Sequence, residues 1–156
     1  MRQLDEGTQD NRGGGQKDEG VASVKWLKAS PQKRIEDEIT EFPLLHACCG
    51  KQNGFGTITL DIDPDMHPTV IGDVRNLPFK SDSFAAAFMD CPWTAGWKKN
   101  ISLTIKELLR VAPIVYVLSP WIYGSSICKI TEIKIAWQPG VNQTLCFCKY
   151  ERNSSG

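Results

Sequence analysis

The chain has 156 residues, of which 41% are hydrophobic, and its 18 Lys and Arg balance 18 Asp and Glu. This length provides one ordinary domain with a real core and excludes a two-domain arrangement. The zero net charge excludes a strongly basic nucleic-acid-binding domain, although the residues through Trp93 carry about −5 and those after it about +5. That asymmetry permits a nucleic-acid-binding face.

Targeting and redox signals are absent from the sequence. No apolar run reaches the roughly 18 residues of a membrane-spanning helix, and the N-terminus is too polar for a signal peptide. The six cysteines show neither the paired spacing of zinc sites nor the density of a small secreted scaffold. We therefore expect a soluble protein of the reducing cytoplasm, with no membrane partner.

The first part of the chain predicts a helix after a disordered segment. Residues 1–20 are polar and glycine-rich, which predicts disorder. Residues 21–42 are expected to form an N-terminal helical extension. Within it, Pro31 to Phe42 is predicted as a helix with Ser30 as its N-cap and with Ile35 and Ile39 facing inward.

Residues 43–152 alternate between strand and helix patterns. Apolar runs predict strands at Pro43 to Cys48, Thr57 to Ile62, Phe84 to Met89 and Ile114 to Leu118, with Val70 and Ile71 beginning a further one. Asn100 is expected to cap a helix that ends near Val111. A Pro-Gly turn between Thr131 to Trp137 and Thr144 to Tyr150 is typical of a hairpin. The pattern predicts one α/β domain with an open, mostly parallel sheet and a C-terminal antiparallel hairpin, followed by a flexible tail at residues 153–156.

The first crossover of this sheet is short. Only the eight residues from Cys49 to Gly56 separate the first two predicted strands, whereas a parallel crossover usually needs a dozen or more. We therefore expect the first helix to be missing or reduced to a turn, with Gly50, Gly54 and Gly56 shaping a loop in its place.

Polar residues follow the predicted strands in an ordered series. The strand ends carry Cys49-Gly50, Asp61 to Asp63, Asp73, and Asp90 to Trp93. In open parallel sheets ligands bind outside the carboxyl ends of the strands. The series therefore predicts a site for a nucleoside-type cofactor.

These segments carry a resemblance to a known family. The quoted motifs are Leu44-Leu45-His46-Ala47-Cys48-Cys49-Gly50, Leu60-Asp61-Ile62-Asp63, Gly72-Asp73-Val74-Arg75-Asn76-Leu77-Pro78-Phe79 and Asp90-Cys91-Pro92-Trp93. As a series they resemble the class I S-adenosylmethionine-dependent methyltransferases, which have a Rossmann-like fold, over roughly Pro43 to Tyr150.

The resemblance implies a role for each predicted cofactor-binding residue. Ala47, Cys49 and Gly50 would wrap the methionine part of S-adenosylmethionine, and Asp61 would accept hydrogen bonds from the ribose hydroxyls. Asp73 would accept from the adenine amino group, and the backbone N–H of the next residue, Val74, would donate to a ring nitrogen. The alternative for Asp73 is an ordinary turn residue.

The Asp90-Cys91-Pro92-Trp93 segment is similar to the Asp-Pro-Pro-Trp signature of enzymes that methylate exocyclic amino groups, especially N6 of adenine. The similarity implies a catalytic turn in which Asp90 and a carbonyl near Pro92 bind the amino hydrogens while Trp93 stacks on an extruded base. One alternative is a strand end followed by an ordinary loop. Another makes Cys91 a nucleophile, as in cytosine C5 methylation, although that family usually has proline before the cysteine.

Two other clusters have open interpretations. A metal or redox site would form if neighbouring strands carried His46, Cys48, Cys49 and Cys91. Because the spacing of these residues is not that of known metal ligands, buried thiols without a metal are favoured. The aromatic residues Trp93, Trp97, Trp121 and Tyr123 lie beside Lys98 and Lys99 in a combination that either binds a nucleic acid strand or fills the core.

The leading hypothesis is a compact enzyme that moves a methyl group from S-adenosylmethionine to an amino group of a nucleobase in DNA or RNA. Two alternatives stay open: a degenerate relative that serves as a binding or regulatory subunit, and a small-molecule methyltransferase. Because no separate target-recognition region is visible, nucleic-acid specificity would require an oligomer, a partner subunit or the N-terminal residues.

Overall fold

The structure is a computed structural model that describes residues 25–52, 54–90, 92, 95–136, 140 and 142–154. Its strands are β1 (Leu44–Ala47), β2 (Ile58–Asp61), β3 (Val70–Ile71), β4 (Ala86–Met89), β5 (Ile114–Ser119), β6 (Cys128–Ala136) and β7 (Leu145–Arg152). Its helices are α1 (Pro31–Glu38), α2 (Ala95–Lys98) and α3 (Ile101–Val111), with a 3-10 turn η1 (Pro64–Met66). The expected α/β class is confirmed.

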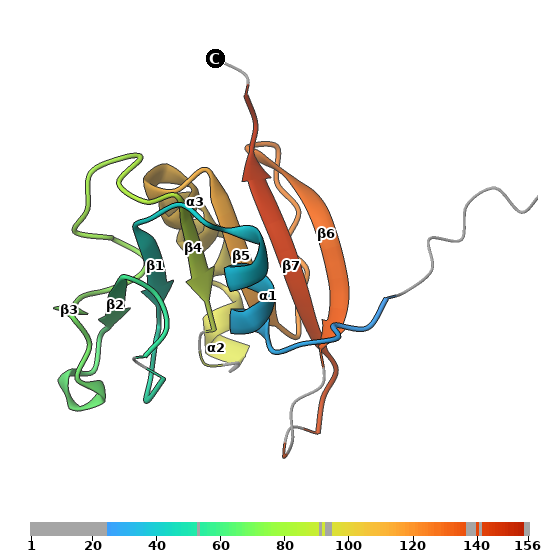
Figure 1. Ribbon diagram of the computed structural model, residues 1–156, viewed down its shortest axis with the longest axis horizontal. Coiled ribbons are helices and arrows are strands. Elements are labelled where there is room, and N and C mark those ends of the chain that lie inside the picture. Colours follow the sequence, from blue (N-terminus) through green and yellow to red (C-terminus); the bar gives the residue numbers. More distant parts are fainter. Residues whose placement is uncertain are drawn as a thin grey trace, which may run out of the picture.

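All of these strands belong to one sheet with the order β3-β2-β1-β4-β5-β7-β6. β1, β2, β3, β4 and β5 pair in parallel, whereas β7 is antiparallel to both β5 and β6. The predicted hairpin and the single antiparallel strand are therefore confirmed (Figure 1). The strand order reverses between β1 and β4, and such a switch point opens a crevice at the carboxyl ends of the strands.

The link between β1 and β2 crosses without a helix, as the short spacing predicts. In residues 48–57, residue 53 aside, the backbone forms turns, and Cys48 and Gly50 adopt positive φ angles of 53° and 52°. The loop is tied to the sheet by hydrogen bonds from Cys49 N to Leu60 O (3.1 Å) and from Thr57 N to Leu44 O (2.8 Å). These bonds hold β1 and β2 in parallel pairing despite the short connection.

Gly56 is the tightest position of this loop. Its φ is +86°, and a Cβ built there would lie 3.2 Å from Leu44 O and 3.2 Å from His46 Cβ. Since a left-handed conformation costs a non-glycine residue about 1–2 kcal/mol before any clash, we expect Gly56→Ala to lower the free energy of unfolding by about 2 kcal/mol in urea denaturation. Gly54→Ala is the matched control, because nothing lies within 4 Å of a Cβ there. Equal effects of the two substitutions would contradict this account.

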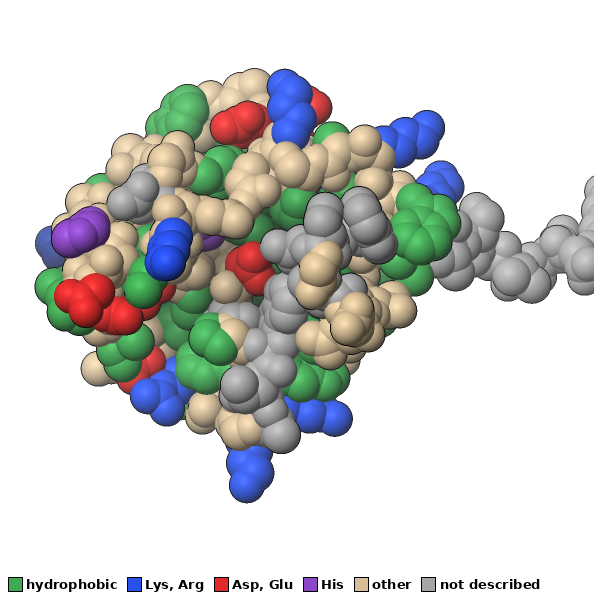
Figure 2. Space-filling view, turned by 90° about the horizontal axis from the view of Figure 1, so that it is seen from below, with side chains coloured by type: hydrophobic (Ala, Val, Ile, Leu, Met, Phe, Trp, Pro, Cys, Tyr) green, Lys and Arg blue, Asp and Glu red, His purple; other side chains and the backbone are tan. Residues whose placement is uncertain are grey.

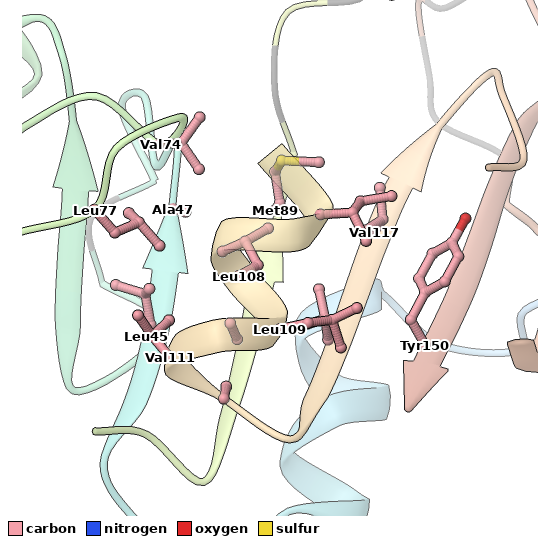
Figure 3. Close-up of a cluster of buried hydrophobic side chains, with 14 of the residues drawn as sticks. Leu45, Ala47, Val74, Leu77, Met89, Leu108, Leu109, Val111, Val117 and Tyr150 are labelled. Atoms are coloured by element: carbon pink, nitrogen blue, oxygen red, sulfur yellow. The ribbon is translucent and has the colours of Figure 1, made fainter. Parts of the chain in front are cut away.

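Each face of the sheet carries a separate apolar cluster. α3 covers one face, where Ile105, Leu108 and Leu109 are buried against strand residues such as Leu45 and Val117 (Figure 3). α1 lies on the opposite face (Figure 1). There its Ile35 is fully buried in the second cluster. The inward direction predicted for Ile35 is confirmed.

Ion pairs fix α1 to the hairpin strands. Arg34 of α1 pairs with Glu132 of β6 at 2.8 Å, and Glu38 pairs with Lys149 of β7. Lys149 is only 12% exposed and Glu38 28%, so these charges are screened less than surface pairs. The N-terminal helix is therefore a layer of the same fold.

Some local expectations were wrong. α1 ends at Glu38, not at Phe42, because Ile39 is already extended (φ −96°, ψ 106°) as the chain turns toward Pro43. Asn100 lies at the start of α3, but its side chain caps nothing, because α2 precedes it closely and leaves Asn100 in a helical conformation. Asn153, the first residue of the tail predicted to be flexible, donates a backbone hydrogen bond to Ile127 O; the flexibility of the tail stays a prediction.

Candidate functional site

A cavity of about 390 Å³ opens at the carboxyl ends of the strands, beside the switch point between β1 and β4. Figure 2 views this end of the molecule, where hydrophobic side chains are exposed between charged ones and Lys and Arg lie mainly toward the rim. Six residues singled out from the sequence line this cavity together: Gly50, Asp61, Asp73, Val74, Asp90 and Pro92. Segments far apart in the chain thus meet at one place.

Asp61 ends β2 and organises the floor of the cavity. Its Oδ2 accepts a hydrogen bond from Gly50 N (2.9 Å), and its Oδ1 accepts one from Asp63 N (3.0 Å). The carboxylate therefore holds the loop that replaces the missing helix. Since each carboxylate oxygen has two lone pairs, Asp61 keeps one acceptor position on each oxygen for a ligand.

Asp73 follows β3 and is engaged by Arg75. Its Oδ1 accepts from Arg75 N (2.9 Å) and Nε (2.9 Å), and its Oδ2 accepts from Nε (3.0 Å) and Nη2 (2.6 Å). The Arg75 hydrogen bonds hold the pKa of Asp73 below its ordinary value. The turn role weighed from the sequence is thus present, and a ligand amino group would have to displace Arg75.

The Asp73–Arg75 pair predicts that removal of the Arg75 side chain strengthens cofactor binding. The two side chains are 33% and 39% exposed, and exposed pairs of this kind contribute about 0.2–1 kcal/mol. If Asp73 binds an adenine amino group, Arg75→Ala removes this competitor. We expect S-adenosylhomocysteine to bind the variant roughly two- to fivefold more tightly by calorimetry. Weaker binding would instead make Arg75 itself a ligand contact.

Asp90 directly follows β4 and differs from the other two carboxylates. It forms no ion pair or hydrogen bond with any described residue, and burial raises its pKa from 3.8 to about 6. A carboxyl group with a pKa near neutrality is suited to accept a proton from a reacting group. Asp90 therefore combines a position in the lining of the cavity with a raised pKa.

Two residues expected in the cofactor site lie elsewhere. Ala47 is fully buried in the core on the α3 face, and Cys49 is 4% exposed; neither lines the cavity. In this turn Cys48 and Gly50 face the cavity instead, because Cys48 takes a left-handed conformation and shifts the side-chain alternation after β1. Cys91 and Trp93 lie outside the described residues.

His46 is a core residue. Its ring stacks on Phe88 at 5.2 Å and meets Phe55 edge-on at 5.5 Å. Burial lowers its pKa to about 4, so the imidazole is neutral at physiological pH. The imidazole of His46 therefore lies among the aromatic side chains of the core.

Cys48 is disulfide-bonded, so the expectation of a buried thiol at this position was wrong. β1 and β4 are adjacent, which brings the chain segments after both strands together. Cys49, Cys128, Cys146 and Cys148 are free. Within the described part of the chain, no group of three or more His, Cys, Asp or Glu side chains is arranged to hold a metal ion.

Two further residues line the cavity: Trp97, predicted either to contact a nucleic acid or to fill the core, and Arg75, for which no role was predicted. Trp97 of α2 lines the cavity and packs against the core, and its indole Nε1 is buried without a partner among the described residues. Arg75 lines the cavity beside Asp73. The spacing of Asp73 and Arg75 was a usable signal, because an Asp side chain commonly binds backbone and side-chain groups two residues on.

The other aromatic residues predicted near the strand ends have mixed positions. The hydroxyl of Tyr123 hydrogen-bonds with Ser102 (2.7 Å), and its backbone N–H donates to the Tyr150 hydroxyl (3.1 Å). Trp121 is partly buried, whereas Lys98 and Lys99 are exposed. Among the residues that the structure describes, no helix has the length and hydrophobicity needed to cross a membrane.

Comparisons with known proteins support the fold alone. No family model matches the sequence, and no curated protein matches it. Solved structures do match. A dimethyladenosine transferase from Plasmodium falciparum is 14% identical with a TM-score of 0.55, covering 85% of this chain and 64% of its own. A SAM-dependent methyltransferase from Aquifex aeolicus is 10% identical with a TM-score of 0.51, covering 78% and 89%.

A third similar structure is a complex between the Haloferax volcanii Trm112 methyltransferase activator and a methyltransferase. It is 12% identical with a TM-score of 0.55 and covers 80% of this chain and 89% of its own. The chain therefore has the Rossmann-like fold of S-adenosylmethionine-dependent methyltransferases, as the resemblance implied.

Proposed function

We propose that this protein transfers a methyl group from S-adenosylmethionine to an amino group, and that the acceptor is a nucleobase. The observation that carries the proposal is the shared cavity: Asp61, Asp73 and Asp90 come from three different strand ends and line one space of about 390 Å³ at the switch point. Its volume is in the range of small-molecule sites, and the open acceptor positions of Asp61 suit a ribose.

Each residue that lines the cavity would have a separate role in binding or proton transfer. Bound S-adenosylmethionine supplies an electrophilic methyl group on a positively charged sulfur. Asp61 would hold the ribose, and Trp97 and Val74 would provide apolar contacts. Asp90 would accept an N–H hydrogen bond from the acceptor, which orients the nitrogen lone pair. As the new N–C bond forms, the S–C bond to the methyl group would break with its electron pair left on sulfur, S-adenosylhomocysteine would be the leaving group, and Asp90 would take the proton released from the nitrogen. Pro92 and Trp93 keep their proposed roles in the adjoining turn.

A binding or regulatory subunit is the second candidate. It is favoured by the Asp73 carboxylate, whose acceptor positions are all used by Arg75. The existence of a methyltransferase complex with a separate activator among the similar structures also suggests that a partner subunit is worth testing. In this case the cavity would not take the cofactor.

The test is calorimetric titration of the purified protein with S-adenosylmethionine and S-adenosylhomocysteine, followed by transfer of a labelled methyl group to DNA, RNA, nucleosides and small amines. Binding of both cofactors and labelling of an amino-bearing base would support the enzyme. A folded protein that binds neither cofactor, alone or with its co-purifying partner, would favour the subunit. Labelling of small amines without bases would favour a small-molecule enzyme.

A further inference from the structure

A second cavity, of about 510 Å³, lies on the other side of Asp90. Its walls come from the segment before α1, the β1–β2 loop and the ends of β5, β6 and β7. They include Leu27, Ser30, Gln52, Leu118 and Leu145. Among the described lining residues, Asp90 is the one that both cavities share.

From this arrangement we propose that the second cavity binds the methyl acceptor as an uncharged aromatic amine, an amino-bearing ring of nucleobase size. The inference rests on the proposed function and adds to it the place and chemical class of the acceptor. Methyl transfer needs donor and acceptor atoms about 3–3.5 Å apart and in line. Two cavities that share Asp90 in their linings can place the two reactants against each other beside its carboxylate.

The lining favours an uncharged ring. Leu27, Leu118 and Leu145 provide apolar walls. Apart from Asp90, the only charged side chain among the described lining residues is that of Lys28, which is exposed. A charged ligand would therefore find little compensation for its lost hydration.

The polar lining suits the edge of a heterocycle. Gln32 Nε2 donates to Gln52 Oε1 (2.7 Å) across this side of the cavity. Each amide keeps further donor or acceptor capacity after this bond. Ser30 Oγ accepts from Lys33 N (3.2 Å) and still carries a hydroxyl proton to donate. Such mixed groups match the donors and acceptors along a base edge.

The required chemistry selects an aromatic over an aliphatic amine. An alkylamine resembles lysine, with a pKa near 10.4, so at neutral pH it is an ammonium ion without a free lone pair. In that form it would pair with Asp90, and it must lose a proton before it can attack a methyl group. An aromatic amine is uncharged, and Asp90 would receive its proton only as the N–C bond forms.

The wall formed by the N-terminal segment is fixed to the sheet. Leu27 N donates to Ile135 O (2.8 Å), and Ile135 N donates to Lys25 O (3.0 Å). These bonds add the segment to the edge of β6. The second cavity is therefore a feature of the folded domain, and a substitution in this exposed segment can block it without disturbing the core.

The experiment uses the full chain saturated with S-adenosylhomocysteine, so that the probes cannot occupy the cofactor cavity. Matched probes are adenosine against inosine and cytidine against uridine, which differ in the amino group. We expect the amino-bearing nucleosides to bind at least fivefold more tightly. Ala29→Trp, an exposed position of the second cavity, should weaken their binding at least tenfold and leave the affinity for S-adenosylhomocysteine within twofold. Glu36→Trp, on the exposed side of α1, is the control.

The outcomes separate the two proposals. If the wild type does not bind S-adenosylhomocysteine, both the proposed function and the proposed acceptor site are overturned. If S-adenosylhomocysteine binds but the paired probes bind with equal affinity, the acceptor site alone is overturned. The same holds if Ala29→Trp has no effect on methyl transfer to any acceptor. A further arm uses labelled S-adenosylmethionine in place of S-adenosylhomocysteine and offers, as acceptors, the nucleosides or single-stranded oligonucleotides that contain the same bases. Labelling of oligonucleotides only would assign the ring to an extruded base, and labelling of nucleosides only to a free metabolite.

Discussion

Asp90→Asn is expected to remove most methyl transfer and, at the same time, to stabilise the folded protein at pH 7. The loss of activity follows because an amide cannot take the proton that the acceptor nitrogen releases, and general bases typically contribute 10²–10⁴-fold to a rate. The gain in stability follows because the charged carboxylate is costly in its buried position. If Asp90 only ended a strand, Asp90→Asn would give the gain in stability without the loss of activity.

The pH dependence of that stability has a definite sign. Burial raises the pKa of folded Asp90 from 3.8 to about 6, so the folded state holds its proton more tightly than the unfolded state. The associated stability is fully present below about pH 4 and is lost as the pH rises through about 6. Urea denaturation should show this loss in the wild type and not in Asp90→Asn. At pH 7 we expect a difference on the order of 2 kcal/mol, after allowance for partial exposure of the group.

The control for this experiment is Asp65→Asn, which changes an exposed carboxylate in η1 outside both cavities. It should change neither the rate nor the pH profile of stability. Methyl-transfer rates of the wild type should rise as the pH passes about 6, because only ionised Asp90 accepts a proton. An Asp90→Asn variant that retains full activity would exclude Asp90 as the proton acceptor.

Asp61→Ala is expected to weaken S-adenosylhomocysteine binding about 100-fold. Hydrogen bonds to a charged group contribute about 1.5–3 kcal/mol each, and the carboxylate would accept from the ribose while it holds Gly50 N at 2.9 Å. The measurement is calorimetric titration, with circular dichroism to confirm the fold. Asp61→Asn should lose less, because its amide oxygen still accepts from Gly50 N.

Asp63→Ala provides the comparison, since Asp63 is exposed, accepts from Asp65 N (2.9 Å) and does not line the cofactor cavity. It should leave the affinity nearly unchanged. If Asp61→Ala and Asp63→Ala weaken binding equally, the effect arises from the turn after β2 and Asp61 is not a ribose ligand.

Local sequence patterns predicted the order of elements and the edge of the sheet where the polar residues gather. The apolar runs at β4 and before Asp61 predict strands, because the apolar side chains of a strand must be buried against another layer. The eight-residue spacing after β1 was sufficient to predict the missing helix. Parallel strands carry their carboxyl ends to one edge, so the meeting of Asp61, Asp73 and Asp90 also followed from the sequence.

In contrast, long-range packing sets which side chains face the cavity and what surrounds each carboxylate. Neither Ala47, which is buried within β1, nor Cys49, which follows the left-handed turn at Cys48, lines the cavity. Backbone angles such as those of Cys48 depend on how the loop packs over β1. The bidentate contact of Arg75 with Asp73 and the desolvation of Asp90 depend on distances and burial, which no residue pattern contains. The second cavity arises where the N-terminal segment docks on β6, far away in the sequence. Local patterns therefore fix the strands and their ends, whereas long-range packing sets the charge state and surroundings of the groups found there.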